Sequence, residues 1–128
     1  MKFRYTILYV ENVEETLDFY EAAFGLSRKM LHEGGDYGEL DTGTTLLAFA
    51  SRELISRIGK SPSVADPKAP CFEIAFETDD VAAGITLAVK HGAKLVQEAT
   101  EMPWGQTVGY VSDSNGFLIE ICTEIAAA

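Results

Sequence analysis

The chain has 128 residues, of which 47% are hydrophobic and 23% charged, enough for one domain or for two small modules that share a core. Its net charge of −10 argues against a nucleic-acid partner, and no apolar run reaches the length of a membrane-spanning helix. The first residues lead directly into a strand rather than a signal peptide, and two cysteines are too few for a disulfide framework, so we expect a cytoplasmic protein without a membrane partner.

The first half of the chain predicts a strand, a helix and three more strands. Residues 3–10 are rich in β-branched and aromatic side chains, as strands are. Asn12 is a candidate N-cap for a helix that Gly25 would end. The following strands are expected at residues 27–32, 37–41 and 44–50, before a short helix at 52–58. This order is βαβββ.

The second half repeats that order after a proline-rich segment. A strand at residues 71–77 ends in Asp79-Asp80, which can cap a helix that Gly92 stops. Further strands are expected at 94–98, 106–112 and 117–122, the last two joined by the turn Asp113-Ser114-Asn115-Gly116. We interpret residues 1–59 as a first module, 60–70 as a linker and 71–128 as a second module, together one domain.

An internal repeat supports this division. Shifted by 68 positions Tyr5 falls on Glu73, and shifted by 72 positions Ala48 falls on Glu120. The predicted fold class is therefore α+β, with two βαβββ modules that form a cupped mixed sheet and carry their helices on the outer face.

Strand alternation sorts the side chains between two faces. Phe72, Ile74 and Phe76 would lie under the following helix, and Glu73 would point the opposite way. By the repeat, this second face also holds Tyr5, Ile7, Tyr9, Ala48 and Glu120. Glu120 lies between two apolar neighbours, Leu118 and Cys122, and an isolated buried carboxylate is costly, so it is the first candidate for a site.

Three segments carry a resemblance to a known family: VENVEETLDFYEAAFGL, FEIAFETDDV and WGQTVGYVSDSNGFLIEI. With the double βαβββ order they resemble the vicinal oxygen chelate superfamily, which includes glyoxalases, bleomycin-resistance proteins, fosfomycin-resistance enzymes and extradiol dioxygenases. The resemblance implies a metal ligand at each of four strand positions, here Tyr5, Ala48, Glu73 and Glu120. Glu120 alone matches the family pattern, and two carboxylates with a phenol suit a transition metal poorly. We therefore favour no cofactor, with Glu120 and Glu73 as the ligands of any divalent metal.

Superfamily members that lack the metal positions include drug-binding resistance proteins, which are dimers. The resemblance thus implies a homodimer that binds a small aromatic or cationic molecule in a cupped cavity. The expected ligand-binding residues are Tyr5, Ile7, Tyr9, Ala48, Glu73, Trp104, Tyr110 and Glu120. Two alternatives stay open. One is a metal-dependent lyase, isomerase or dioxygenase, and the other is metal-free acid–base chemistry with Glu73 and Glu120 as catalytic residues.

Overall fold

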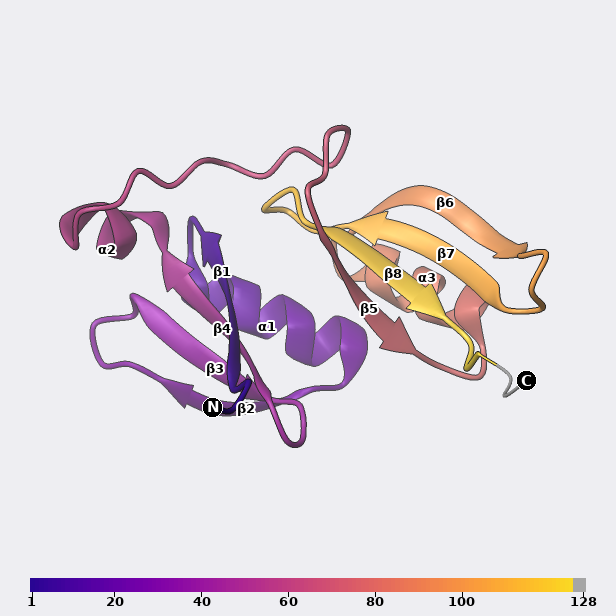
Figure 1. Cartoon of the computed structure of the whole chain (residues 1–128), viewed down its shortest axis with the longest axis horizontal. Helices are drawn as coiled ribbons and strands as arrows, with labels where there is room; N and C mark the ends of the chain where they lie inside the picture. The colour runs from indigo at the N-terminus through magenta and orange to yellow at the C-terminus, as the bar shows by residue number, and fades with distance from the viewer. Residues whose placement is uncertain (126–128) are drawn as a thin grey trace. The chain divides into compact units, whose positions relative to one another are not determined.

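A computed structural model describes residues 1–125 of the chain, which divides into two compact units, Met1–Val64 and Ala65–Ala128 (Figure 1). We refer to these units as the first and the second module. The first module contains β1 (Tyr5–Val10), α1 (Val13–Phe24), β2 (Ser27–Leu31), β3 (Tyr37–Asp41), β4 (Leu46–Ser51) and α2 (Arg52–Arg57). The second contains β5 (Glu73–Glu77), α3 (Val81–Lys90), β6 (Lys94–Glu101), β7 (Thr107–Ser112) and β8 (Leu118–Cys122).

Each module forms its own four-stranded mixed sheet. The strand order is β1-β4-β3-β2 in the first module and β5-β8-β7-β6 in the second. The first strand of each module pairs in parallel with the last, and the other pairs are antiparallel. The prediction of an α+β fold built from two βαβββ modules is confirmed.

Helix α1 begins and ends, and α3 begins, where the sequence predicts. Asn12 accepts a hydrogen bond from the Glu15 backbone N–H at 3.0 Å, and Asp80 accepts one from Ala83 at 3.0 Å, so both act as N-caps. Gly25 ends α1 in the left-handed conformation, with φ of 69°. Within residues 1–125, no helix is both long enough and apolar enough to span a membrane.

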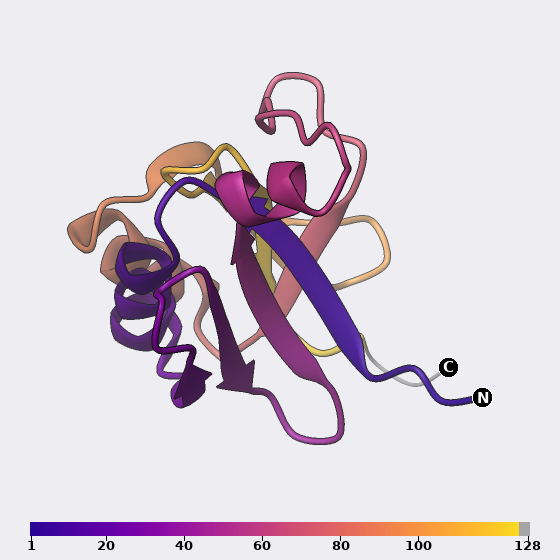
Figure 2. The same ribbon diagram turned by 90° about the vertical axis from the view of Figure 1, so that its left-hand side faces the viewer.

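One long helix packs on one face of each sheet, α1 in the first module (Figures 1 and 2) and α3 in the second. The core of the first module lies between α1 and its sheet, where the Tyr20 and Phe49 rings are 5.0 Å apart. In the second module Ile119 and Ile121 are buried on the corresponding face of β8. The opposite face of each sheet, here called the second face, carries the predicted site residues other than Trp104.

A glycine lets each helix approach its sheet. A Cβ atom on Gly38 of β3 would lie 2.7 Å from Leu17 Cδ1, and one on Gly109 of β7 would press on Ile85 Cδ1. The two glycines therefore have the same place and the same reason in both modules. The repeat inferred from sequence extends to the packing of the core.

One expectation about the faces is wrong. Phe72 precedes β5 instead of belonging to it, and its side chain is 46% exposed rather than covered by α3. Its ring lies 6.0 Å from that of Phe117 at an angle of 67°. Because β5 begins only at Glu73, the alternation of the strand does not apply to Phe72.

Candidate functional site

The second face of the second module brings together two carboxylates and a phenol. Tyr110 on β7 is the direct cross-strand partner of Glu120 on β8, so the two side chains share a face. The parallel pairing of β5 with β8 places Ala75 opposite Glu120 and Glu73 opposite Leu118. Glu73 is therefore the diagonal neighbour of Glu120 on the same face. The sequence alone did not establish that these carboxylates meet.

Burial and the neighbouring carboxylates raise the pKa of both Glu120 and Tyr110. The Tyr110 hydroxyl donates to Glu120 Oε1 at 3.5 Å, a long and weak hydrogen bond. Burial, followed by the negative charge of Glu73 and a hydrogen bond with it, raises the pKa of Glu120. Burial and then the charges of Glu120 and Glu73 raise the pKa of Tyr110 to about 12. The cluster therefore holds negative charge that its surroundings stabilise poorly.

A surface depression adjoins this cluster. It has a volume of about 250 Å³ and is lined by Pro70, Cys71, Phe72, Glu73 and Leu118. Glu73 belongs to both the depression and the carboxylate pair. An apolar hollow with an aromatic ring and a carboxylate at its edge suits part of a small organic cation.

The first module has a counterpart that the sequence analysis missed. The Tyr37 hydroxyl donates to Glu39 Oε2 at 2.7 Å, and Glu39 is only 8% exposed. Burial, the hydrogen bond and charge of Glu39, and then Tyr5, raise the pKa of Tyr37 well above its ordinary value. An acid in the middle of a strand between Gly38 and Leu40 was the signal that could have revealed Glu39.

At two pairs of equivalent positions, one module has a phenol where the other has a carboxylate. Glu39 pairs with Ala48 as Tyr110 pairs with Glu120, so Glu39 and Tyr110 are equivalent. Likewise the repeat places Tyr5 where the second module has Glu73. Each module thus carries one phenol and one carboxylate at these two positions, in opposite order.

The other predicted residues occupy varied places. Ile7 and Tyr9 lie on the second face of β1 beside Ala48 and Ala50, and Tyr5 and Ile7 are 46% and 45% exposed. Trp104 lies in the turn between β6 and β7, where its indole N–H donates to Gln106 Oε1 at 2.8 Å. Because that N–H is engaged, Trp104 offers a ligand its ring face and not a hydrogen bond.

The four positions that hold metal in the superfamily do not fit a metal here. Ala48 is fully buried and its methyl group has no donor atom, and Tyr5 supplies only a phenol. Within residues 1–125, no three His, Cys, Asp or Glu side chains gather as a metal-binding group. Glu73 and Glu120 supply carboxylate oxygens without the imidazole or thiolate that transition metals usually take.

Comparison with known proteins agrees with this fold. A family model described as a glyoxalase-like domain matches residues 3–126. A lactoylglutathione lyase of Neisseria meningitidis serogroup A is 31% identical over 130 residues, covering 94% of this chain and 88% of the relative. Among solved structures, a glyoxalase-related enzyme from Fulvimarina pelagi superposes with a TM-score of 0.83 at 20% identity, covering 97% of this chain and 88% of that one.

A glyoxalase/bleomycin resistance protein/dioxygenase family enzyme from Burkholderia phytofirmans is similar too, with a TM-score of 0.75 at 18% identity over 95% of this chain and 97% of that one. These structural likenesses concern the fold. The family model covers nearly the whole chain, and the lyase relative agrees with it. The chain therefore belongs to the glyoxalase-like domain family of the vicinal oxygen chelate superfamily.

Proposed function

We propose that this protein binds a small aromatic cation without a transition metal, through the cluster of Glu73, Tyr110 and Glu120. The observation that carries the proposal is the approach of two carboxylates, Glu73 and Glu120, on adjacent strands. Burial and then this approach raise the pKa of Glu120. A cation placed between the two carboxylates would replace a repulsion with two attractions. This is the drug-binding type of function within the superfamily.

Aromatic side chains near the cluster support an aromatic ligand. Tyr110 belongs to the cluster, and the exposed Phe72 ring borders the depression beside Glu73. An aromatic cation gains both from stacking on such rings and from the negative charge. We assign Trp104, which lies in the same module, to the wider ligand-binding surface. Ligand contacts by Tyr5, Ile7, Tyr9 and Ala48 of the first module stay a prediction from the sequence.

Titration calorimetry with a matched pair of probes tests the proposal. N-methyl-4-phenylpyridinium carries a permanent positive charge, and 4-phenylpyridine has nearly the same shape but is neutral at pH 7.5. We expect the cation to bind more tightly than the neutral probe, and Glu120→Gln to remove most of that preference. Glu101→Gln makes the same change of net charge on β6 and should leave the preference intact. Equal affinity for both probes would contradict the proposal.

Metal-free acid–base catalysis is a second candidate, favoured by the raised pKa of Glu120. A carboxyl group that keeps its proton to higher pH than usual is suited to donating it to a bound substrate. Glu73 would then be the second carboxyl group of the catalytic pair. A turnover that depends on both carboxylates and persists in the presence of a chelator would support this candidate.

Elemental analysis separates both candidates from the metal-dependent lyase, isomerase or dioxygenase. Untagged protein, purified without chelator, is dialysed against zinc, nickel, manganese and iron. We expect less than a tenth of a metal ion per chain after gel filtration, since the donor set is poor. About one ion per chain, lost in Glu120→Gln, would restore the metal-dependent alternative.

We also expect a homodimer and a cytoplasmic location.

A further inference from the structure

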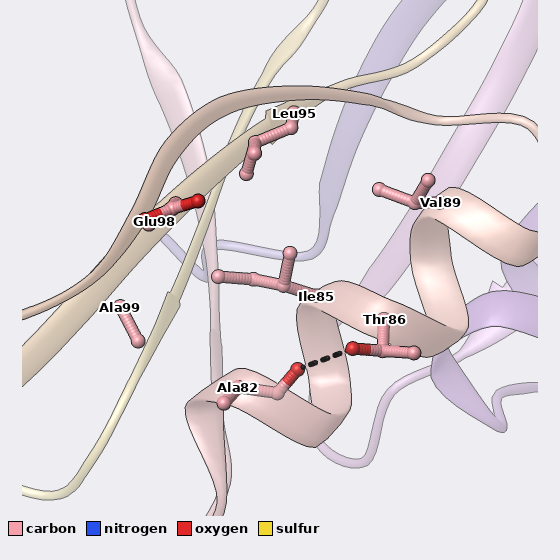
Figure 3. Close-up of a pocket in the computed structure, with 7 residues that line it drawn as sticks. All are labelled: Ala82, Ile85, Thr86, Val89, Leu95, Glu98 and Ala99. Atoms are coloured by element: carbon pink, nitrogen blue, oxygen red, sulfur yellow. Dashed lines mark hydrogen bonds between the residues drawn. The ribbon is translucent and has the colours of Figure 1, made fainter.

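A groove on the helix side of the second module belongs to neither carboxylate cluster. It runs between α3 and β6 and has a volume of about 520 Å³, within the range of small-molecule pockets (Figure 3). Its lining residues are Ala82, Ile85, Thr86, Val89, Leu95, Glu98 and Ala99. Figure 3 shows Ile85 of α3 and Leu95 of β6 pointing into the space between the two elements.

In the first module, ion pairs join the helix and strand at the equivalent place, between α1 and β2. Arg28 of β2 bonds to Glu21 Oε1 of α1 through Nε at 2.9 Å and through Nη2 at 2.6 Å. Its Nη2 atom also bonds to Asp18 Oδ1 at 2.7 Å. This network lies across the junction of helix and strand, so charged side chains fill the space there.

The register identifies the residues that replace this network in the second module. Glu39 and Tyr110 are equivalent, so Leu40 and Val111, the residues that follow them, are equivalent too. Arg28 pairs with Leu40, and Leu95 pairs with Val111. Leu95 therefore takes the place of Arg28 in the second module. The two helices align on their N-caps, Asn12 and Asp80, which are 68 positions apart. Moved by the same 68 positions, Glu21 falls on Val89 and Asp18 on Thr86.

All three replacements line the groove. Leu95 and Val89 are 47% and 42% exposed, a large exposure for apolar side chains on facing elements. The Thr86 hydroxyl donates to the Ala82 carbonyl oxygen at 3.0 Å and is therefore already engaged within α3 (Figure 3). The groove is open because the charged side chains that fill its counterpart are missing.

Glu98 gives the groove its charge. It is the one ionisable residue of the lining, and within residues 1–125 no Lys, Arg or His side chain forms an ion pair with its carboxylate. An apolar groove with a single carboxylate complements a molecule with an apolar body and one positive charge.

We propose that the groove between α3 and β6 binds a small apolar amine, with the hydrocarbon body against Ile85, Val89 and Leu95 and the ammonium group at Glu98. This site is separate from the carboxylate pair of Glu73 and Glu120 and does not depend on the function proposed for that pair. Its occupant is a small molecule, because the groove has the volume of a ligand site and offers one charge only.

Amide chemical shifts locate binding of 4-phenylbutylamine, with 4-phenylbutanol as the neutral match. We expect the amine to shift amides of residues 81–101 and to bind more tightly than the alcohol. Glu98→Gln should weaken the amine about two- to fivefold, as for an exposed ion pair, and leave the alcohol unchanged. Shifts confined to β5 and β8 would overturn the proposal, since they belong to the other cluster.

A closing variant gives the decisive comparison. Val89→Glu with Leu95→Arg rebuilds the ion pair of the first module across the groove and should weaken binding of both probes at least tenfold. Unchanged affinity in this variant would overturn the proposal. A wild-type dimer that dissociates in the closing variant would also overturn it, because a second copy of the chain would then be the occupant. If the double variant fails to fold, Glu98→Gln alone still decides.

Discussion

Replacing Glu120 by glutamine should stabilise the free protein and weaken its complex with a cation. In the folded chain Glu120 lies near Glu73 on an adjacent strand, and both burial and that charge raise its pKa above the ordinary value of 4.5. The folded state therefore holds this proton to a higher pH than the unfolded chain does. The stability of the wild type falls as pH rises from the ordinary carboxyl pKa through the raised one.

Replacing Glu120 by glutamine removes this loss of folding stability and leaves the shape of the side chain almost unchanged. Neighbouring like charges on a sheet destabilise by about 0.2–1 kcal/mol, so we expect Glu120→Gln to raise the free energy of unfolding at pH 7 by about 0.5 kcal/mol. Little is lost through Tyr110, since its hydrogen bond to Glu120 is already 3.5 Å long. At pH 4, where the wild-type carboxyl group is protonated, the two proteins should be equally stable.

Binding should change in the opposite direction. A half-buried carboxylate that contacts a cation contributes more than an exposed ion pair, and we take about 1.4 kcal/mol, or tenfold in affinity. The exposed Glu73 should contribute less, about two- to threefold. A residue that destabilises the free protein and stabilises a complex is one kept for binding.

Urea unfolding at pH 4 and pH 7, with titration of N-methyl-4-phenylpyridinium at pH 7.5, measures both effects. The reasoning fails if Glu120→Gln lowers the unfolding free energy by more than about 1 kcal/mol while the affinity is unchanged. Glu120 would then be a structural residue that the fold needs, and its raised pKa would have no connection with a ligand.

Three other predictions concern the modules themselves. Gly38→Ala should cost about 1–3 kcal/mol of unfolding free energy in urea, because its Cβ would lie 2.7 Å from Leu17, whereas Gly34→Ala, with nothing nearer than 3.9 Å, should cost far less; equal losses would refute the packing argument. Tyr37→Phe should cost about 1–3 kcal/mol in the same assay, because it removes a donor from the buried Glu39, and no loss would mean that water or another group satisfies that carboxylate. Sedimentation at micromolar concentration should give twice the chain mass of 13.9 kDa, and a monomer would refute the homodimer.

Most of the fold could be predicted because its signals are local. The N-caps at Asn12 and Asp80 and the helix end at Gly25 depend on residues within four positions of each other, and the structure confirms all three. The strand at Tyr37–Asp41 was predicted with its observed bounds for the same reason. Phe72 was misplaced because alternation assigns a face but does not determine where pairing with the partner strand begins.

The candidate site depended on pairing between distant strands, which local patterns do not determine. Glu73 and Glu120 could be placed on the same kind of face from sequence, but only the parallel register of β5 with β8 makes them diagonal neighbours. Glu39 was missed because residues 37–41 have the alternating pattern of an ordinary strand, which does not mark one acid as buried. Its burial depends on the place of β3 between β2 and β4 in the sheet.

The same registers explain how one repeated scaffold carries two different surfaces. On the second faces, the first module has a phenol on β1 (Tyr5) and a carboxylate on β3 (Glu39). The second module has the reverse, a carboxylate on β5 (Glu73) and a phenol on β7 (Tyr110), and it also has Glu120 where the first module has Ala48. On the helix side, the first module holds the ion pairs of Arg28 and the second has lost them. Because the backbone pairing is conserved between the modules at these positions, each difference lies in side chains alone. The paired carboxylates and the open groove thus both distinguish the second module from the first, and substitutions that give the second module the first module's side chains can test each surface.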